Sequence, residues 1–361
     1  MNKFRMPTDQ CAIVSDGQSS SRLSAGRRSG AAVFPLLAAL LVSGCASKAD
    51  RTAGATNSTV NQEVAAALQE EGTIEFFDHA WTSSTIQAEV LAQVFEKLGG
   101  DASVKTAAHV DSAFVTLSKD PDVFDPEVWT ILWEPQIEQY VERDKTVEIF
   151  YESELTAEEG WYVPTYVIEG DAERGIEPTC PGLPDWQALN DCADVFATAK
   201  TAPKGQYTSG AKEWGPYYGD PQRIENLGLD YQIEYAGSEA ALMAEWRRAY
   251  EQGEPFLGLM WTPTYTGLKY DVTRVEFPPY SEDCWGSTFA CNWDNIEILG
   301  LSSPEFREAH PTGSKILDKY DLNDEQLLDI MTRVEEKGLT PKDAVAEWIE
   351  ENPEVWQAWA S

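Results

Sequence analysis

Two short apolar segments, each closed by a tryptophan and a proline, constrain the fold of this chain more than any other feature. Residues 128–133 (Val-Trp-Thr-Ile-Leu-Trp) precede a Glu-Pro pair, and residues 256–261 (Phe-Leu-Gly-Leu-Met-Trp) precede a Thr-Pro pair. Each is typical of a β-strand whose last residue, Trp133 or Trp261, enters a turn set by the proline. In open α/β sheets, ligands bind beyond the carboxyl ends of the strands. The two segments therefore predict two lobes that present aromatic side chains to one shared cleft.

The charge of the chain is strongly negative. With 61 acidic residues against 27 basic ones among 361, the formal net charge is −34. Phosphate binding needs a basic surface, so this balance excludes nucleic acid as a partner. It favours long-range attraction of cations, although a solubilising surface, as in a salt-adapted organism, is the simpler explanation. The length and an apolar content of 42% allow two ordinary globular domains.

The first 44 residues have the pattern of an export signal. Two adjacent arginines precede an apolar run at 31–42, which is too short to span a membrane. The run ends in Leu-Val-Ser-Gly-Cys45, which is similar to a bacterial lipobox. We therefore expect residues 1–44 to be a signal peptide and Cys45 to carry lipid, with an ordinary cleavage site as the alternative. Residues 45–72 are mostly small and polar and predict a flexible tether, so the protein is expected in the periplasm, anchored to the cell envelope by lipid.

Four cysteines downstream of Cys45 predict two disulfides. An even number of cysteines suits an oxidising compartment outside the cytoplasm. The short separations favour bonds between Cys180 and Cys192 and between Cys284 and Cys291. Neither pair has the CxxC spacing of a zinc site, so we expect no metal.

Strand and helix patterns alternate along the rest of the chain, which indicates an α/β fold. The clearest predicted elements are a strand at 73–77 and helices at 86–98, 238–250, 323–336 and 341–350. Ser84 and Gln87 form a predicted capping box for the first of these helices. An extended run at 160–168 is interpreted as the crossover between the lobes. We assign residues 73–166 and 276–361 to one lobe and residues 167–275 to the other.

Known enzyme motifs are missing from the sequence. The histidines, His79, His109 and His310, fit no metal-binding spacing, and the chain has no nucleophile elbow, phosphate-binding loop or dinucleotide fingerprint. His79 is expected to be a hydrogen-bonding loop residue. The many carboxylates leave a glycosidase pair open on composition alone. We expect no enzymatic activity and no cofactor.

Tryptophan is unusually frequent in this chain, with 13 copies. Most of them, Trp129 included, are expected to pack in the core. Trp133, Trp214 and Trp261 differ because each stands before a turn that contains proline. Indole faces attract cations by roughly 0.5–2 kcal/mol per contact, and a quaternary ammonium group donates no ordinary hydrogen bond. These three residues therefore predict an aromatic cage for a small cation.

In their order and spacing, the segments around Trp133, Trp214 and Trp261 resemble the substrate-binding proteins of glycine betaine/proline betaine ABC importers. The loop at 81–86 is also similar to that family, and the resemblance covers about 73–360. It implies a two-lobed periplasmic-binding-protein fold of α/β class, with a ligand closed in the cleft between the lobes. It also implies that the protein delivers a quaternary ammonium ligand to an ABC permease and its ATPase.

The resemblance implies site residues by matching position. The three tryptophans would surround the trimethylammonium head. A ligand carboxylate would meet backbone N–H groups near Gly215 and polar groups beside Trp133. Gln136 stands where one branch of the family has a histidine, and Tyr265 is a further ligand-binding candidate.

The anionic end of the ligand stays open at this point. Glycine betaine, proline betaine, choline, carnitine, trimethylamine N-oxide and sulfonium osmolytes all carry a suitable head. The alternative function is a secreted carbohydrate-binding protein or glycoside hydrolase whose tryptophans stack on sugar rings. A structural lipoprotein of the envelope, with every tryptophan in the core, is the simplest alternative.

Overall fold

A computed structural model describes residues 62–107, 110–294 and 296–361. The predicted signal peptide, Cys45, His109 and the first part of the predicted tether lie outside the described residues. Within the described ranges, no helix has the length and apolar character needed to cross a membrane.

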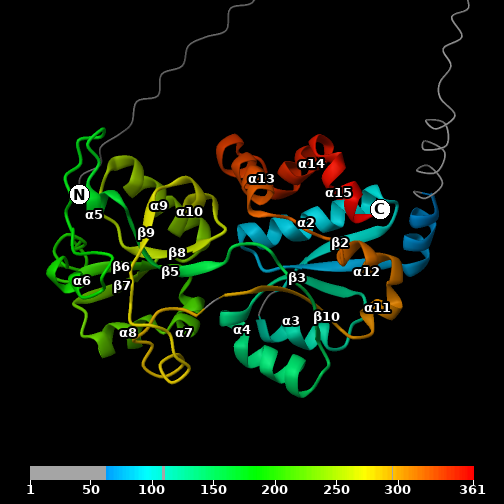
Figure 1. The fold of residues 1–361 in the computed structure, drawn as a ribbon, viewed down its shortest axis with the longest axis horizontal. Coiled ribbons are helices and arrows are strands. Elements are labelled where there is room, and N and C mark those ends of the chain that lie inside the picture. Colours follow the sequence, from blue (N-terminus) through cyan, green and yellow to red (C-terminus); the bar gives the residue numbers. More distant parts are fainter. Residues whose placement is uncertain (1–61, 108–109, 295) are drawn as a thin grey trace, which may run out of the picture. The chain divides into compact units, whose positions relative to one another are not determined.

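Two five-stranded sheets organise the described chain (Figure 1). The strands of the first sheet are β1 (Thr73–Asp78), β2 (Asp101–Thr106), β3 (Val123–Trp129), β4 (Glu148–Glu152) and β10 (Ile298–Ser302). They lie in the order β2-β1-β3-β10-β4. β1 runs parallel to β2 and β3, whereas β10 runs antiparallel between β3 and β4.

The second sheet has the order β7-β6-β8-β5-β9. Its strands are β5 (Glu158–Pro164), β6 (Gly205–Ser209), β7 (Tyr231–Tyr235), β8 (Gly258–Thr262) and β9 (Val272–Arg274). β6 is parallel to β7 and β8, and β5 is antiparallel to β8 and β9. Parallel pairs joined through helices confirm the predicted α/β class.

Helices cover both faces of the first sheet. They are α2 (Thr82–Lys97), α3 (Val110–Leu117), α4 (Thr130–Gln136), the π-helix η1 (Ile137–Arg143), α11 (Phe306–Ala309), α12 (Pro311–Leu317), α13 (Asp324–Lys337), α14 (Pro341–Glu351) and α15 (Pro353–Trp359). α2 packs on β1 and β2 and is covered by α13 and α14, while α3 and α4 lie on the opposite side (Figure 1).

The second sheet is covered in the same way. Its helices are α5 (Tyr166–Glu169), α6 (Ala188–Asp191), the 3₁₀-helix η2 (Lys212–Trp214), α7 (Gly215–Tyr218), α8 (Asp220–Leu227), α9 (Glu239–Gln252) and α10 (Tyr265–Lys269). α9 and α10 lie on one side, and α7 and α8 on the other (Figure 1). The predicted strand at 73–77 and the three later helices are found with every end within two residues of the prediction. Ser238 caps α9 by accepting the N–H of Ala241.

The predicted capping box at the start of α2 is wrong. The helix begins at Thr82, and the Ser84 hydroxyl instead accepts the backbone N–H of His79 at 3.0 Å. The carboxylate of Glu239, from α9, takes the capping position and accepts the Thr82 N–H at 2.9 Å. A tertiary contact therefore replaces the local cap that the sequence pattern predicted.

The chain crosses between the two sheets at other positions than predicted. β5 belongs to the second sheet, so the first crossing lies between β4 and β5 rather than at residue 166. The second crossing lies directly before β10 rather than at residue 276, because the intervening loop packs on α8, where Arg223 donates to the carbonyl of Cys291. We define lobe 1 as residues 62–152 and 298–361, and lobe 2 as residues 158–294.

Residues 62–71, predicted as the end of a flexible tether, are helical. Val64 and Leu68 have the i, i+4 spacing of one helical face, and Leu68 is buried in the core. Glu71 accepts two backbone N–H groups in the first turn of α12. A carboxylate at a helix N-terminus is electrostatically favourable, so this segment docks on lobe 1.

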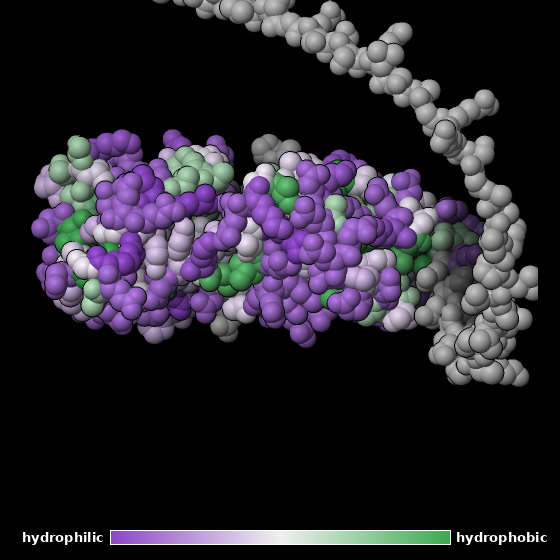
Figure 2. Space-filling model, turned by 90° about the horizontal axis from the view of Figure 1, so that it is seen from above, coloured by the Kyte–Doolittle hydropathy of each residue, from purple (hydrophilic) through white to green (hydrophobic). Residues whose placement is uncertain are grey.

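Both predicted disulfides are present in lobe 2. Cys180 is bonded to Cys192 and Cys284 to Cys291, with Cα atoms 5.9 and 6.3 Å apart. The face seen in Figure 2 is largely hydrophilic, with hydrophobic residues in small separate areas. Such a surface is expected of a chain with this excess of carboxylates.

Candidate functional site

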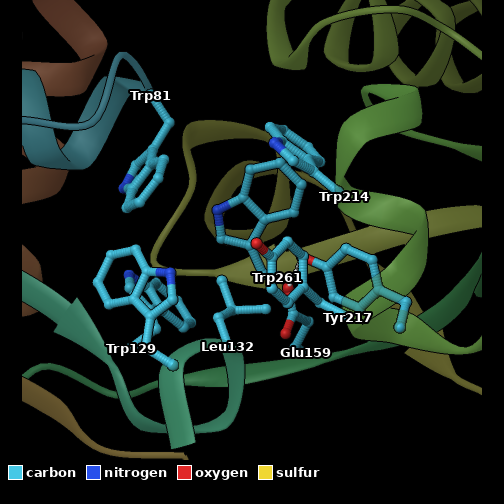
Figure 3. A pocket seen from close by; sticks show the side chains of 9 residues that line it. Trp81, Trp129, Leu132, Glu159, Trp214, Tyr217 and Trp261 are labelled. Atoms are coloured by element: carbon cyan, nitrogen blue, oxygen red, sulfur yellow. Dashed lines mark hydrogen bonds between the residues drawn. The ribbon is translucent and has the colours of Figure 1, made fainter. Parts of the chain in front are cut away.

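A cavity of about 80 Å³ lies between the lobes and is lined almost entirely by aromatic side chains (Figure 3). The lining residues are Trp81, Trp129, Leu132, Trp133, Glu159, Trp214, Tyr217, Tyr218 and Trp261. Lobe 1 supplies the first four of these residues and lobe 2 supplies the other five. Aromatic groups of both lobes therefore face the same space.

The wall from lobe 2 is built by Trp214 and Trp261. Trp261 is near the end of β8, as predicted, and Trp214 ends the 3₁₀ turn before α7. Their rings meet edge to face, with centroids 5.7 Å apart and an interplanar angle of 82°. Trp214 lies against Gly210, where a Cβ atom would approach the indole to 2.2 Å. Glycine at this position is therefore what leaves room for the Trp214 ring.

The wall from lobe 1 differs from the prediction. The segment 128–133 is not one strand: β3 ends at Trp129, and α4 begins at the next residue. Trp133 lies in α4, where the backbone leaves helical geometry (φ −125°, ψ 23°) two residues before Pro135. Short apolar runs fit strand and helix patterns equally well, which is why the sequence misplaced this boundary. Because the strand changes to a helix within this segment, both Trp129 and Trp133 line the cavity.

Trp133 has a second role in the core of lobe 1. Its side chain is 1% exposed and belongs to a small cluster with Phe77 and Phe114. Its ring centroid lies 5.9 Å from that of Trp81 and 4.7 Å from that of His79. Trp133 therefore forms the part of the cavity wall that is continuous with the core.

His79 supports the lobe 1 wall from behind. Its ring stacks on Trp81, with centroids 4.9 Å apart and an interplanar angle of 13°. Its Nε2 lies 2.8 Å from Oδ2 of Asp125. Burial disfavours the charged imidazole, but the charge and hydrogen bond of Asp125 outweigh this effect and raise the pKa of His79. The prediction of His79 as a hydrogen-bonding residue is confirmed.

Glu159 is the one carboxyl group in the lining. It stands on β5 directly opposite Trp261 on β8, so the antiparallel register brings both to the cavity. Its Oε1 accepts the Tyr218 hydroxyl at 2.5 Å, whereas its buried Oε2 has no hydrogen-bond partner among the described residues. Burial raises the pKa of Glu159 to about 8, against the lowering effect of Tyr218 and with the help of the nearby Asp220. Near neutral pH the group is therefore mainly an acid with an O–H to donate.

Three predicted site residues are placed elsewhere. Gly215 is not in the lining, and its N–H donates to the carbonyl of Lys212 within the 3₁₀ turn. Gln136 is half-buried at the end of α4, also outside the lining. Tyr265 lines a different cavity and donates its hydroxyl to Glu336 at 2.6 Å. The predicted receptor for a ligand carboxylate is thus not assembled around this cavity.

Sequence reasoning missed several lining residues. The sequence predicts Trp129 in the core, and it predicts Trp81 only as part of the loop at 81–86 that resembles the family. Glu159 and Tyr218 carried no local signal, because an acidic residue at a strand start and a tyrosine in a Gly-Pro-Tyr-Tyr turn are both ordinary on a surface. For Trp129, the usable signal was the pair of acidic residues, Asp125 and Glu127, that precede it in an otherwise apolar strand.

Comparison with known proteins places the chain in a family. Residues 72–351 match the family described as the substrate binding domain of an ABC-type glycine betaine transport system. The trimethylamine N-oxide-binding protein of Pelagibacter ubique (strain HTCC1062) is 29% identical over 290 residues, which cover 77% of this chain and 87% of that protein.

Solved structures show the same fold. An ABC-transporter choline-binding protein in complex with choline has a TM-score of 0.60 at 20% identity, covering 80% of this chain and 91% of that chain. Lactococcal OpuAC, in its closed conformation with glycine betaine, has a TM-score of 0.60 at 17% identity, covering 80% of this chain and all of that chain. Both support the predicted two-lobed binding-protein fold.

The family match also decides between the functional alternatives. Its members are extracytoplasmic proteins that bind a small solute for an ABC permease and its ATPase, and they are not enzymes. A carbohydrate-binding or glycoside-hydrolase function is therefore not favoured, and a quaternary ammonium osmolyte is the ligand class. The match spans well over half of the sequence, so this chain belongs to the substrate-binding domains of ABC-type glycine betaine transport systems.

Proposed function

We propose that the ligand of this protein is trimethylamine N-oxide, held by Trp81, Trp129, Trp133, Trp214 and Trp261 and by Glu159. The observation that carries the proposal is that Glu159, the one carboxyl group in a lining that is aromatic apart from Leu132, has a buried Oε2 with no hydrogen-bond partner among the described residues. Trimethylamine N-oxide joins a trimethylammonium head directly to one oxygen, which needs a hydrogen-bond donor. The protonated carboxyl of Glu159 is such a donor.

Glycine betaine suits this lining less well. Its carboxylate needs several donors or a cation when it is buried. Among the nine described lining residues none carries a positive charge, and the carboxyl of Glu159 offers a carboxylate only a single O–H. The Gly215 N–H, which would serve such a group, is already bonded to Lys212. The similarity to a protein named for trimethylamine N-oxide binding agrees with this choice.

Calorimetric titration of the purified protein at pH 7 with trimethylamine N-oxide, glycine betaine and choline tests the proposal. Trimethylamine N-oxide should bind at least about tenfold more tightly than glycine betaine, because a buried charge without partners costs several kcal/mol. Glu159→Ala should abolish this preference. Glu158→Ala is the matched control, since Glu158 is the exposed neighbour on the same strand. Tighter binding of glycine betaine or choline would overturn the assignment of the oxide.

We also infer that the protein reaches the envelope as a lipoprotein. The support is the sequence of residues 1–45, with its short apolar run and the lipobox before Cys45. Labelling of cells with a radioactive fatty acid should mark the protein, and Cys45→Ala should remove the label. An unlabelled wild-type protein would contradict the lipid anchor. N-terminal sequencing of the mature protein would then show whether the signal peptide is still removed.

A further inference from the structure

The carboxyl group of Glu127 lies one layer behind the lobe 1 wall of the cavity. Glu127 is completely buried and is not a lining residue. Glu127 stands two residues before Trp129 on β3, where a register shift between Asp125 and Val128 interrupts the regular alternation of side chains. Its carboxyl group accepts the indole N–H of Trp129 and lies outside the lining of the cavity.

Four side-chain donors converge on this carboxyl group. Oε1 accepts the indole N–H of Trp81 at 2.6 Å, the indole N–H of Trp129 at 2.9 Å and the hydroxyl of Ser83 at 2.7 Å. Oε2 accepts the amide N–H of Gln87. One carboxyl group thus holds Trp81 and Trp129, two of the three tryptophans that lobe 1 supplies to the lining.

The donors around Glu127 favour its ionised form. An indole N–H can only donate. The amide oxygen of Gln87 accepts the Tyr320 hydroxyl at 3.2 Å, which directs its amide nitrogen at Glu127. Burial raises the pKa of Glu127 by more than the four hydrogen bonds lower it. A proton on the carboxyl would nevertheless find only the Ser83 hydroxyl as an acceptor, because both indole N–H groups and the Gln87 amide nitrogen can only donate. Three of the four partners can therefore bond only to a carboxyl oxygen that accepts, which favours the carboxylate.

Other charged groups nearby do not cancel the negative charge of the Glu127 carboxylate. His79 and Asp125 form an ion pair at 2.8 Å and so largely cancel each other. The tyrosines Tyr151 and Tyr320, which also feel the charge of Glu127, stay neutral because burial raises their pKa values well above the usual range. The net charge directly behind the lobe 1 wall is therefore negative.

We propose that Glu127 is a specificity-determining residue that makes the lobe 1 half of the cage selective for positive charge. A hydrogen bond from an indole N–H to a carboxylate shifts electron density into the ring and makes its face more negative. Trp81 and Trp129 both receive this effect, in a buried environment that weakens it little. Glu127 is a positioning residue for these rings and a source of potential at the ligand head, without touching the ligand.

This inference uses the trimethylammonium head that the ligands of the family share, so it does not rest on the oxide contact of Glu159. Tetramethylammonium chloride and tert-butanol are suitable probes, since they have similar size and tert-butanol carries no charge. Both are titrated calorimetrically at pH 6.5, tert-butanol by competition against tetramethylammonium. At this pH Glu159, with a pKa of about 8, is mainly neutral and does not bias the comparison.

The readout is the ratio of the two affinities. Glu127→Gln keeps the size of the side chain and removes the charge, and it should lower the ratio about tenfold or more, the scale of one desolvated cation–π contact. The change should fall on tetramethylammonium, with tert-butanol binding altered less than about threefold. Glu239→Gln is the matched control: Glu239 is a half-buried carboxyl that contacts the start of α2 and no indole, and its variant should leave the ratio unchanged.

Equal loss of both probes in Glu127→Gln would show a structural role and overturn the proposal, as would an unchanged ratio. If that variant does not fold by circular dichroism, Trp129→Phe is compared with Trp214→Phe. Both variants keep an aromatic ring in the wall and lose part of the attraction to a cation, because indole is the better cation–π partner, but only Trp129 donates to Glu127. The ratio should therefore fall further in Trp129→Phe, and an equal fall in both variants would refute the coupling. If Glu127→Gln lowers the ratio as expected but the wild type does not prefer trimethylamine N-oxide to glycine betaine, only the assignment of the oxide as ligand is refuted.

Discussion

Raising the pH from 6.5 to 9 should weaken the binding of trimethylamine N-oxide about tenfold. Only the protonated form of Glu159 donates to the oxide, and burial raises the pKa of this group to about 8. The apparent dissociation constant then scales as 1 + 10^(pH − 8), which is about 1 at pH 6.5 and about 11 at pH 9, or roughly 1.4 kcal/mol. The sign follows from the proton: it is present below the pKa and is lost as the pH rises through it.

Calorimetry in buffers of different ionisation enthalpy measures the same linkage directly. At pH 8.5 roughly three quarters of the Glu159 carboxyls are ionised in the free protein, so binding should take up about 0.8 proton per ligand. Glu159→Gln keeps an N–H donor and should bind with little pH dependence and no uptake. Choline, a cation without an oxide, should instead bind more tightly as the pH rises. Constant wild-type affinity between pH 6.5 and 9, or the same loss in Glu159→Gln, would refute the reasoning.

Three further predictions concern the cage and the stability of the fold. Trp214→Ala should weaken ligand binding about tenfold or more with a small change in unfolding free energy, whereas Trp133→Ala should also lose about 3–5 kcal/mol of stability in urea unfolding because the ring is in the core. Burial raises the pKa of Glu239 to about 7, above the ordinary 4.5, so its contribution to stability is present at low pH and is lost as the pH rises through 7. Compared with Glu239→Gln, the wild type should lose unfolding free energy between pH 5 and 7.5. Parallel plots of unfolding free energy against pH for the two proteins would contradict this. Replacement of Cys284 and Cys291 by serine opens a loop of sequence separation 7 and should cost about 2 kcal/mol; an unchanged urea midpoint would show that the loop is held without the bond.

The sequence predicted the fold class and singled out Trp133, Trp214 and Trp261, which line the cavity, because both predictions depend on local patterns. Alternating strand and helix signals were enough for an α/β chain, and Trp214 and Trp261 stand where proline-containing turns leave the sheet. The boundary between β3 and α4 after Trp129 could not be predicted, because Trp-Thr-Ile-Leu-Trp suits a strand as well as a helix. The site therefore gained Trp129 in addition to Trp133.

The polar part of the site could not be read from the sequence. Glu127 and Glu159 are two of 61 acidic residues, and what separates them from the rest is burial, which depends on tertiary structure. The resemblance to a family placed a carboxylate receptor near Gly215, but local hydrogen bonding in the 3₁₀ turn uses that N–H. The lobe boundaries in the structure differ from the predicted ones for a similar reason. The lobe to which β5 and the loop before β10 belong depends on strand pairing and packing, which composition does not show.

The position of β10 determines the order in which the lobes can be completed during synthesis. β4 joins the lobe 1 sheet through β10, which is made after every strand of lobe 2. When the ribosome has released residues 1–294, lobe 2 has all five of its strands, while β3 and β4 still present open edges to each other. Open strand edges are common sites of wrong pairing. Lobe 1, whose first four strands are made before lobe 2, therefore cannot complete its sheet until β10 has been made. A nascent chain arrested before β10 should accordingly resist protease over 158–294 and remain cleavable within 73–152.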